Sequence, residues 1–221
     1  MLAMPDLGCL YHAAPLHYLL RIVQDGALYP KSVLAGRGIR PRASAARRDR
    51  MLGLADYCHL SLHPQTPLLA DKLRRGYPHA LLVFDREHVL ALPHVALIPY
   101  NTKAWFDKAA YAPVADAAQK QALLHAHACQ GRYPSLEVLV KYGLGLEGLK
   151  FIAFCADEEH TQTAQTTTAL GLSLPAPLCA CPSLFPLQGE FRPATQDAVF
   201  DYFAACRAAR SVLPPPEIAF D

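Results

Sequence analysis

Hydrophobic and polar positions follow two different periods along the chain, which predicts a fold that mixes helices and strands. In residues 16–23 (LHYLLRIV) apolar side chains recur at helical spacing, and the Asp-Gly pair that follows is typical of a helix end and a turn. Tyr11 and His12 precede this helix and are expected at the end of a strand. Residues 56–63 (DYCHLSLH) alternate between polar and apolar as a strand does, and the prolines after them predict its end.

Compact apolar runs predict further strands along the chain. These runs are residues 79–85 (HALLVFD), 94–100 (HVALIPY), 135–143 (SLEVLVKYG) and 149–156 (LKFIAFCA). Because the first two are separated by a short connection, we expect a small sheet.

Helices are expected in segments that contain few β-branched residues. These segments are 46–52 (ARRDRML), 105–110 (WFDKAA) and 116–128 (DAAQKQALLHAHA). Residues 161–189 are rich in Thr, Pro, Leu and small residues, which predicts an irregular excursion. A final helix over residues 194–213 has an apolar face and ends at a run of prolines.

The order of these elements predicts one α+β domain over residues 1–221, a split, mostly antiparallel sheet with flanking helices. The chain has 221 residues, of which 52% are hydrophobic and 18% charged, and this length and composition suit a folded globular domain. No internal repeat and no linker-like segment divides it.

The N-terminus and the cysteines indicate a protein of the reducing cytoplasm. The first residues lack the basic region of a signal peptide, and no uninterrupted apolar run predicts a membrane span. Seven cysteines, an odd number scattered along the chain, argue against a complete disulfide framework.

Positive charge is concentrated in one segment. The net charge is only +2, but residues 37–50 (RGIRPRASAARRDR) hold six arginines against one aspartate. Such a segment can neutralise phosphates, or it can be a solvated loop.

Motifs for metals and for common nucleotide sites are missing from the sequence. Cys179 and Cys181 form a lone Cys-x-Cys without a second pair, and His125 and His127 are two residues apart, which places them on different faces of a helix. No GxGxxG follows a strand and no GxxxxGK[ST] occurs. We therefore expect no metal site, no Rossmann site and no P-loop.

Three segments of the chain resemble the DarT-type DNA ADP-ribosyltransferases in their order and spacing. They are the opening LYHAAPLHYLLRIVQDGALYP, the basic ARRDR followed by LADYCHLSLHPQTPLL, and the glutamate-bearing SLEVLV followed by LKFIAF. The resemblance covers about residues 10–154. It departs from the family at CHLSLH, where the family usually has a Pro-Phe-Tyr-Phe strand, and residues 160–221 have no counterpart in it.

The resemblance implies an ADP-ribosyltransferase-like fold and an enzyme of the glycosyltransferase class that uses NAD⁺ as ADP-ribose donor without a metal. Breaking the bond between nicotinamide and ribose passes through an oxocarbenium-like state, by analogy with glycoside cleavage. A carboxylate near the ribose stabilises the growing positive charge and helps to deprotonate the acceptor. The resemblance gives this catalytic role to Glu137.

The resemblance also implies a set of cofactor-binding residues. A guanidinium group binds phosphate well, and the position in the motif selects Arg48, in a catalytic and a cofactor-binding role, with Arg47 beside it. His12 and Tyr11 are expected to bind the cofactor. Tyr57 is expected on the nicotinamide side, where Asp56 is the alternative.

Each main candidate also has an ordinary structural explanation. A glutamate on a half-buried strand, such as Glu137, is more often solvated. His12 could satisfy a cap or a hydrogen bond in the core, and Arg48 could simply be exposed. Glu147 lies in a glycine-flanked segment and is typical of a turn.

Modification of a base requires an accessible base, so the resemblance implies single-stranded nucleic acid, with DNA as the expected substrate. A basic groove that carries an aromatic residue could be formed by Arg40, Arg42, Arg50, Lys103, Trp105 and Lys108. The family context implies a toxin of a toxin–antitoxin system, with an ADP-ribosyl hydrolase as antitoxin. The alternatives are transfer to protein or RNA, plain NAD⁺ hydrolysis, and a catalytically silent nucleic-acid-binding module.

Overall fold

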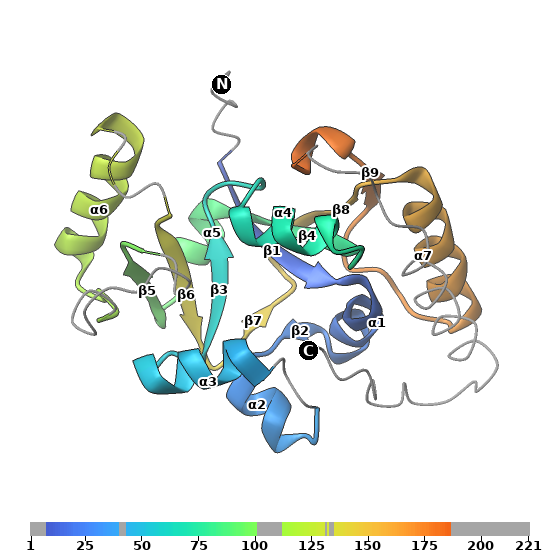
Figure 1. Ribbon diagram of the computed structural model, residues 1–221, viewed down its shortest axis with the longest axis horizontal. Coiled ribbons are helices and arrows are strands. Elements are labelled where there is room, and N and C mark those ends of the chain that lie inside the picture. Colours follow the sequence, from blue (N-terminus) through green and yellow to red (C-terminus); the bar gives the residue numbers. More distant parts are fainter. Residues whose placement is uncertain (1–7, 40–42, 101–111, 131, 133–134, 187–221) are drawn as a thin grey trace. The chain divides into compact units, whose positions relative to one another are not determined.

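The chain divides into two compact units. Figure 1 labels its helices and strands. The computed structural model describes residues 8–39, 43–100, 112–130, 132 and 135–186. The first unit comprises Met1–Gly26, His63–Val89 and Leu146–Pro214, and the second comprises Ala27–Leu62, Leu90–Gly145 and Pro215–Asp221. Each unit is therefore built from stretches that are far apart in the sequence.

The first unit is built on a mainly antiparallel sheet. Its strands pair in the order β1 (Cys9–Pro15), β4 (His79–Asp85), β8 (Leu149–Phe154) and β9 (Leu178–Ala180). β4 is antiparallel to both β1 and β8, with Tyr11 opposite Val83, whereas β9 is parallel to β8. β4 is buried along almost its whole length, so its side chains are covered on both faces of the sheet.

Local sequence signals account for the ends of the helices in the first unit. These helices are α1 (Leu16–Asp25), α4 (Pro67–Arg74), α5 (Arg86–Leu90) and α7 (Asp157–Ala169), followed by a 3₁₀ turn at Pro182–Leu184. α1 ends at Gly26, whose φ of 65° lies in the left-handed region that glycine adopts at low cost. α4 begins after Thr66, whose side chain accepts a hydrogen bond from the backbone N–H of Leu69 at 3.2 Å.

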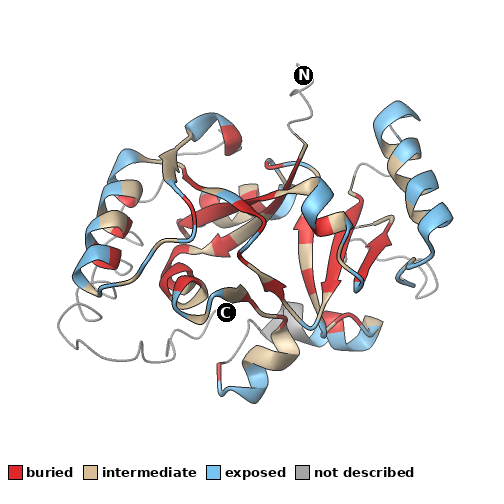
Figure 2. Ribbon diagram, turned by 180° about the vertical axis from the view of Figure 1, so that it is seen from behind, coloured by how far each residue is buried: buried red, intermediate tan, exposed pale blue. Residues whose placement is uncertain are grey.

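An apolar cluster holds the first unit together. It contains Cys9, Tyr11, Leu69, Leu73, Leu81, Val83, Ala153, Leu184 and Phe185. These residues come from three separate stretches of the chain, and Figure 2 shows the strands that carry many of them as buried. Their burial stabilises the unit by tying these stretches together.

The threonine-rich segment after residue 160 forms the greater part of α7, so the prediction of an irregular excursion over 161–189 is wrong for this part. Thr163, Thr166 and Thr167 are buried in the helix, and each hydroxyl donates to a backbone carbonyl, as in the 2.7 Å bond from Thr163 to the carbonyl of Glu159. These bonds satisfy hydroxyls that would otherwise compete with the helix. Acidic residues in the first turn also suit the helix dipole. The amino-acid composition alone does not show that the threonine hydroxyls form these hydrogen bonds.

The main strands of the second unit are also antiparallel to one another. Its strands pair in the order β5 (Val95–Ile98), β6 (Glu137–Lys141) and β3 (Tyr57–Ser61), and a separate short pair joins β2 (Ala27–Leu28) to β7 (Leu144–Gly145). Its helices are α2 (Lys31–Gly36), α3 (Ala43–Leu52) and α6 (Ala117–Gln130). Leu54, Ala96, Ile98 and Leu139 form an apolar cluster within it.

The structure confirms the α+β class and the predicted strands at 56–63, 79–85, 94–100, 135–143 and 149–156, with shorter bounds for most of them. Tyr11 and His12 lie inside β1, not at its end, because the strand continues to Pro15 before α1 begins. Helices α2, α4 and α5 were not predicted. The expected helices at 105–110 and 194–213 lie outside the described residues. Among the described helices, none has the length and apolar character that crossing a membrane requires.

Candidate active site

Glu137 is the first residue of β6, the strand that lies between β5 and β3 in the second unit. It pairs with Ser61 of β3 on one side and with Ile98 of β5 on the other. The residue is only 9% exposed. A carboxylate in such a position needs hydrogen-bond partners, because its burial is otherwise costly. The ordinary explanation of an outward, fully solvated glutamate therefore does not hold.

His59 supplies one such partner. Its Nδ1 lies 2.8 Å from Oε2 of Glu137. His59 is two residues before Ser61 on β3, so it is a diagonal cross-strand neighbour of Glu137 on the same face of the sheet. The structure thus joins the predicted catalytic carboxylate to an imidazole that was not predicted to be part of the site.

The sequence contained a signal for His59. The alternation in DYCHLSLH buries Cys58 and Leu60 and places Tyr57, His59 and Ser61 on the other face of β3. His59 could have been assigned to that face from the alternation alone. The register between β3 and β6, which brings it next to Glu137, could not.

The predicted arginines lie on α3, in the same unit as Glu137. Arg47 and Arg50 are exposed and Arg48 is half-buried. Asp49 between them is only 2% exposed and forms an ion pair with Lys31 of α2. This pair fixes α3 to α2 and so restricts where the neighbouring guanidinium groups can reach.

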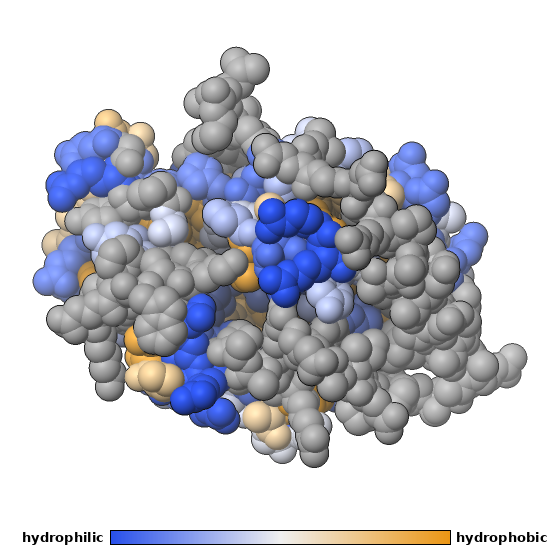
Figure 3. All heavy atoms as spheres, viewed as in Figure 1, coloured by the Kyte–Doolittle hydropathy of each residue, from blue (hydrophilic) through white to orange (hydrophobic). Residues whose placement is uncertain are grey.

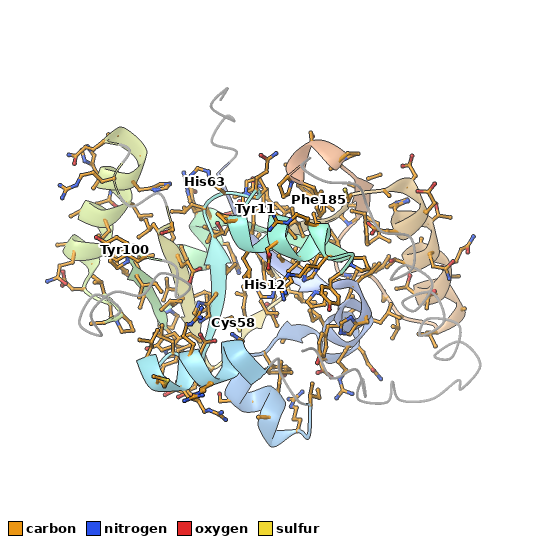
Figure 4. The ribbon with its side chains drawn as sticks, in the orientation of Figure 1. Tyr11, His12, Cys58, His63, Tyr100 and Phe185 are labelled. Atoms are coloured by element: carbon orange, nitrogen blue, oxygen red, sulfur yellow. The ribbon has the colours of Figure 1, made fainter. Side chains whose placement is uncertain are left out.

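Tyr11 and His12 lie on β1 of the first unit (Figure 4). Neighbouring residues of a strand face opposite sides of the sheet. Tyr11 is buried and belongs to the apolar cluster of this unit, which gives it a clear packing role. His12 is half-buried, opposite Leu82 of β4.

Two further histidines of the first unit are buried near this strand. Burial lowers the pKa of His17 to about 3, and the nearby His79 lowers it further. Burial also lowers the pKa of His79 to about 4, against the hydrogen bond that its ring makes with the carbonyl of Tyr77, and His12 lowers it as well. Both imidazoles are therefore neutral at neutral pH, and they add no positive charge around His12.

Tyr57 belongs to a group of rings and one cation at the other end of β3 and β6. Nζ of Lys141 lies 5.9 Å from the centre of the Tyr57 ring and 4.9 Å from that of Tyr142. The ring of His94 meets Tyr142 edge-on at 6.0 Å. We call Tyr57, His94, Lys141 and Tyr142 the aromatic–lysine cluster. It offers stacking surface beside a positive charge.

Tyr142 is the most exposed member of this cluster. It is 59% exposed, and its φ of 69° lies in the left-handed region that a residue with a side chain rarely adopts. Its backbone N–H donates to the carbonyl of Asp56 at 2.9 Å, which helps to hold this conformation. No sequence signal had singled out Tyr142.

The remaining predicted nucleic-acid contacts are described only in part. Arg50 is exposed on α3, where Figure 3 shows hydrophilic and hydrophobic side chains beside one another. The other predicted contacts, Arg40, Arg42, Lys103, Trp105 and Lys108, lie outside the described residues. Glu147 is exposed in a turn, as predicted. Within the described part of the chain, no group of histidine, cysteine and acidic residues has the arrangement of a metal site.

The site has the elements of acid–base and charge-stabilising chemistry. A carboxylate held by an imidazole can accept a proton and can stabilise positive charge that develops on a nearby carbon. Buried surroundings strengthen such an interaction, because they lower the local dielectric constant.

Comparison with known proteins shows likeness at the level of structure. No protein-family model matches the sequence, and no curated protein matches it. The fold is similar to that of Thermus sp. 2.9 DarT in complex with ADP-ribosylated single-stranded DNA, with a TM-score of 0.61 and 15% identity over 82% of this chain and 98% of that one. The complex of the same Thermus protein with NAD⁺ matches with a TM-score of 0.59 and 14% identity over 83% of this chain and 100% of the other.

A second organism provides a further match. Thermosipho africanus DarTG, in complex with ADP-ribose, has a TM-score of 0.60 and 12% identity over 91% of this chain and 67% of that one. At such identities the likeness concerns the fold. This chain therefore has the fold of the DarT ADP-ribosyltransferases, as its sequence motifs had led us to expect.

Proposed function

We propose that this protein is an NAD⁺-dependent ADP-ribosyltransferase that modifies a base in single-stranded DNA. The observation that carries the proposal is the buried carboxylate of Glu137, held by His59 on a strand of a DarT-like fold. Structures with this fold contain NAD⁺ and ADP-ribosylated single-stranded DNA. The position of Glu137 on β6 is consistent with the glutamate-bearing strand on which the sequence resemblance rests.

In the proposed reaction the bond between the nicotinamide nitrogen and C1′ of the ribose breaks, and its electron pair leaves with neutral nicotinamide. The acceptor atom of the base forms a new bond to C1′ and loses its proton to the Glu137 carboxylate, which later releases it to water. Glu137 also stabilises the positive charge on the sugar before the new bond is complete. Arg48, with Arg47 beside it, binds the phosphates, and His12 and Tyr57 bind the dinucleotide, whereas the buried Tyr11 supports β1 by packing in the apolar cluster.

The choice of single-stranded DNA is supported by two features of the second unit. The exposed Arg47 and Arg50 on α3 supply positive charge for a phosphate backbone. The aromatic–lysine cluster supplies an exposed ring on which an unpaired base can stack. Together they suit a flexible, unpaired strand better than a rigid duplex.

We further propose that residues 1–221 act as one ADP-ribosyltransferase domain in the cytoplasm, as the toxin of a toxin–antitoxin system. The likeness to DarTG supports this context. An ADP-ribosyl hydrolase that removes the modification would then be the antitoxin.

Labelled NAD⁺ tests the proposal directly. The purified protein is incubated with the label and a mixed-sequence single-stranded oligonucleotide, and the label is followed on DNA, on protein and as free ADP-ribose. We expect label on the DNA, and a loss of at least about a hundredfold in rate for Glu137→Gln, the order expected for removal of a general base. Glu147→Gln, which changes an exposed glutamate in a turn, is the matched control and should retain activity.

The other outcomes identify the alternatives. Label on protein or on RNA would replace DNA as the acceptor, and free ADP-ribose alone would indicate NAD⁺ hydrolysis. If the protein shifts oligonucleotides in a salt-dependent manner but neither binds nor consumes NAD⁺, it is a silent binding module.

A further inference from the structure

We infer that His59 is a positioning residue for Glu137, which fixes the carboxylate through a hydrogen bond from Nδ1 to Oε2. This inference rests on the proposed function, because it assumes that Glu137 reacts. It adds a residue from the CHLSLH segment, where the sequence departs from the family pattern.

The first step of the argument is geometric. A glutamate side chain has several rotatable bonds, so its carboxylate samples many positions unless something holds it. The hydrogen-bonded atoms are 2.8 Å apart, which is a good hydrogen-bond length, and both side chains are largely buried. His59 itself is held on β3, whose register with β6 pairs Ser61 with Glu137. The imidazole is therefore a fixed donor from a rigid element.

The second step concerns the other groups beside Glu137 in the sheet. Its direct cross-strand neighbours are Ser61 and Ile98. β5 contributes only apolar residues, Val95 to Ile98, and Lys141 of β6 lies four residues away at the opposite end of the strand. Within these described strands, His59 is thus the ionisable side chain placed to hold the carboxylate.

The third step is the chemistry. An ionised carboxylate only accepts hydrogen bonds, so Nδ1 of His59 must carry a hydrogen and donate. A carboxylate held in one orientation is already in place when positive charge develops on the ribose, and it need not reorganise during the reaction. Loss of the donor should therefore slow the chemical step more than it weakens the binding of NAD⁺.

Substitutions of His59 can distinguish the effect of a hydrogen-bond donor at the Nδ1 position from the effect of side-chain volume. The amide nitrogen of an asparagine side chain can occupy the place of Nδ1, whereas that of glutamine lies nearer the place of Nε2. We expect His59→Asn to retain most of kcat, and His59→Ala and His59→Gln to lose roughly tenfold to a hundredfold, the order for a hydrogen bond to a charged group. The dissociation constant for NAD⁺ should change less than threefold in all three. His125→Ala, an exposed histidine on α6, is the control for histidine loss.

Two results would overturn the inference. One is an unchanged kcat for His59→Ala, and the other is an equal loss for alanine, glutamine and asparagine in proteins whose thermal unfolding matches that of the parent. A loss confined to NAD⁺ binding would also contradict it, because it would make His59 a cofactor ligand.

A measurement on the unreacted protein keeps the inference separate from the proposed function. ¹⁵N chemical shifts of the His59 ring report which nitrogen carries hydrogen, and Glu137→Ala should change them. Hydrogen on Nδ1, lost or weakened in that variant, supports the positioning contact even if no transfer activity is found. Hydrogen on Nε2 alone would overturn the contact even in an active enzyme.

Discussion

Asp49 of α3 is buried and forms an ion pair with the partly exposed Lys31 of α2, although the neighbours of Asp49 in the sequence are arginines. A segment that is basic overall therefore uses its one acidic residue to fix the helix. The arrangement allows Arg47 and Arg50 to remain exposed while the helix keeps its place in the second unit.

Removing this anchor should cost stability. Asp49→Ala leaves Lys31 without its buried partner, and we expect a loss of about 1–3 kcal/mol in the free energy of unfolding. Arg50→Ala, one residue away and exposed, should change it by less than about 0.5 kcal/mol. Urea unfolding of both variants measures the difference, and equal stabilities would show that the ion pair does not anchor α3.

Glu159 should make stability depend on pH. It is fully buried in the first turn of α7, and burial raises its pKa from 4.5 to about 7, although the backbone N–H groups of Ala156 and Cys155 oppose the rise. Since the folded-state pKa is raised, the stabilising contribution is complete below about pH 4.5 and is lost as the pH rises through about 7.

Glu159→Gln keeps the size and shape of the buried side chain but cannot ionise. We expect it to unfold like the parent protein near pH 5 and to be more stable than the parent at pH 8.5, by on the order of 2 kcal/mol. Thermal unfolding of both proteins from pH 5 to 8.5 tests this. Parallel curves across the range would mean that Glu159 does not titrate in the folded protein.

Tyr142 should contribute to DNA binding at a measurable cost in backbone strain. If a base stacks on its ring, Tyr142→Ala weakens binding to a single-stranded oligonucleotide by about 1–3 kcal/mol, whereas Tyr142→Phe keeps most of the affinity. Lys141→Ala should reduce the dependence of binding on salt by about one phosphate contact. Fluorescence anisotropy at several salt concentrations measures both effects.

Substitution of Tyr142 by glycine separates the effect of backbone strain on stability from the effect of the ring on DNA binding. Because φ of Tyr142 is 69°, Tyr142→Gly relieves an unfavourable backbone conformation and should not lower the free energy of unfolding, even though it removes the ring. If Tyr142→Ala or Tyr142→Gly binds DNA as tightly as the parent protein, Tyr142 is not part of the proposed interface.

The cysteines should differ strongly in reactivity. Cys58 is buried, its thiol donates to the carbonyl of Leu28 at 3.2 Å, and burial raises its pKa to about 12. Cys129 is exposed. We expect iodoacetamide at pH 8 to label Cys129 at least tenfold faster than Cys58 in the folded protein, since the thiolate is the reactive form. Peptide mass spectrometry at timed intervals checks this, and comparable rates would mean that the unit around Cys58 opens readily.

The sequence predicted elements better than it predicted contacts. The alternation in residues 56–63 and the apolar run HALLVFD located β3 and β4, because the periodicity of a strand depends only on residues that are close together in the sequence. The contact between His59 and Glu137 depends on the register of two strands that are 78 positions apart in the chain, which no local pattern encodes. The prediction for α7 was wrong because it relied on the low helix propensity of threonine. Burial and hydroxyl hydrogen bonds within the helix override that propensity.

The interleaving of the two units limits how this protein can be divided. β4 lies between β1 and β8 in one sheet, yet the chain visits the other unit both before and after it. A cut at residue 90 or 146 therefore separates strands that share a sheet, and no single stretch carrying Glu137 contains a whole unit. Fragments of this polypeptide should fail to fold as autonomous pieces, so a tag is better inserted into an exposed turn of the intact chain, such as that at Glu147.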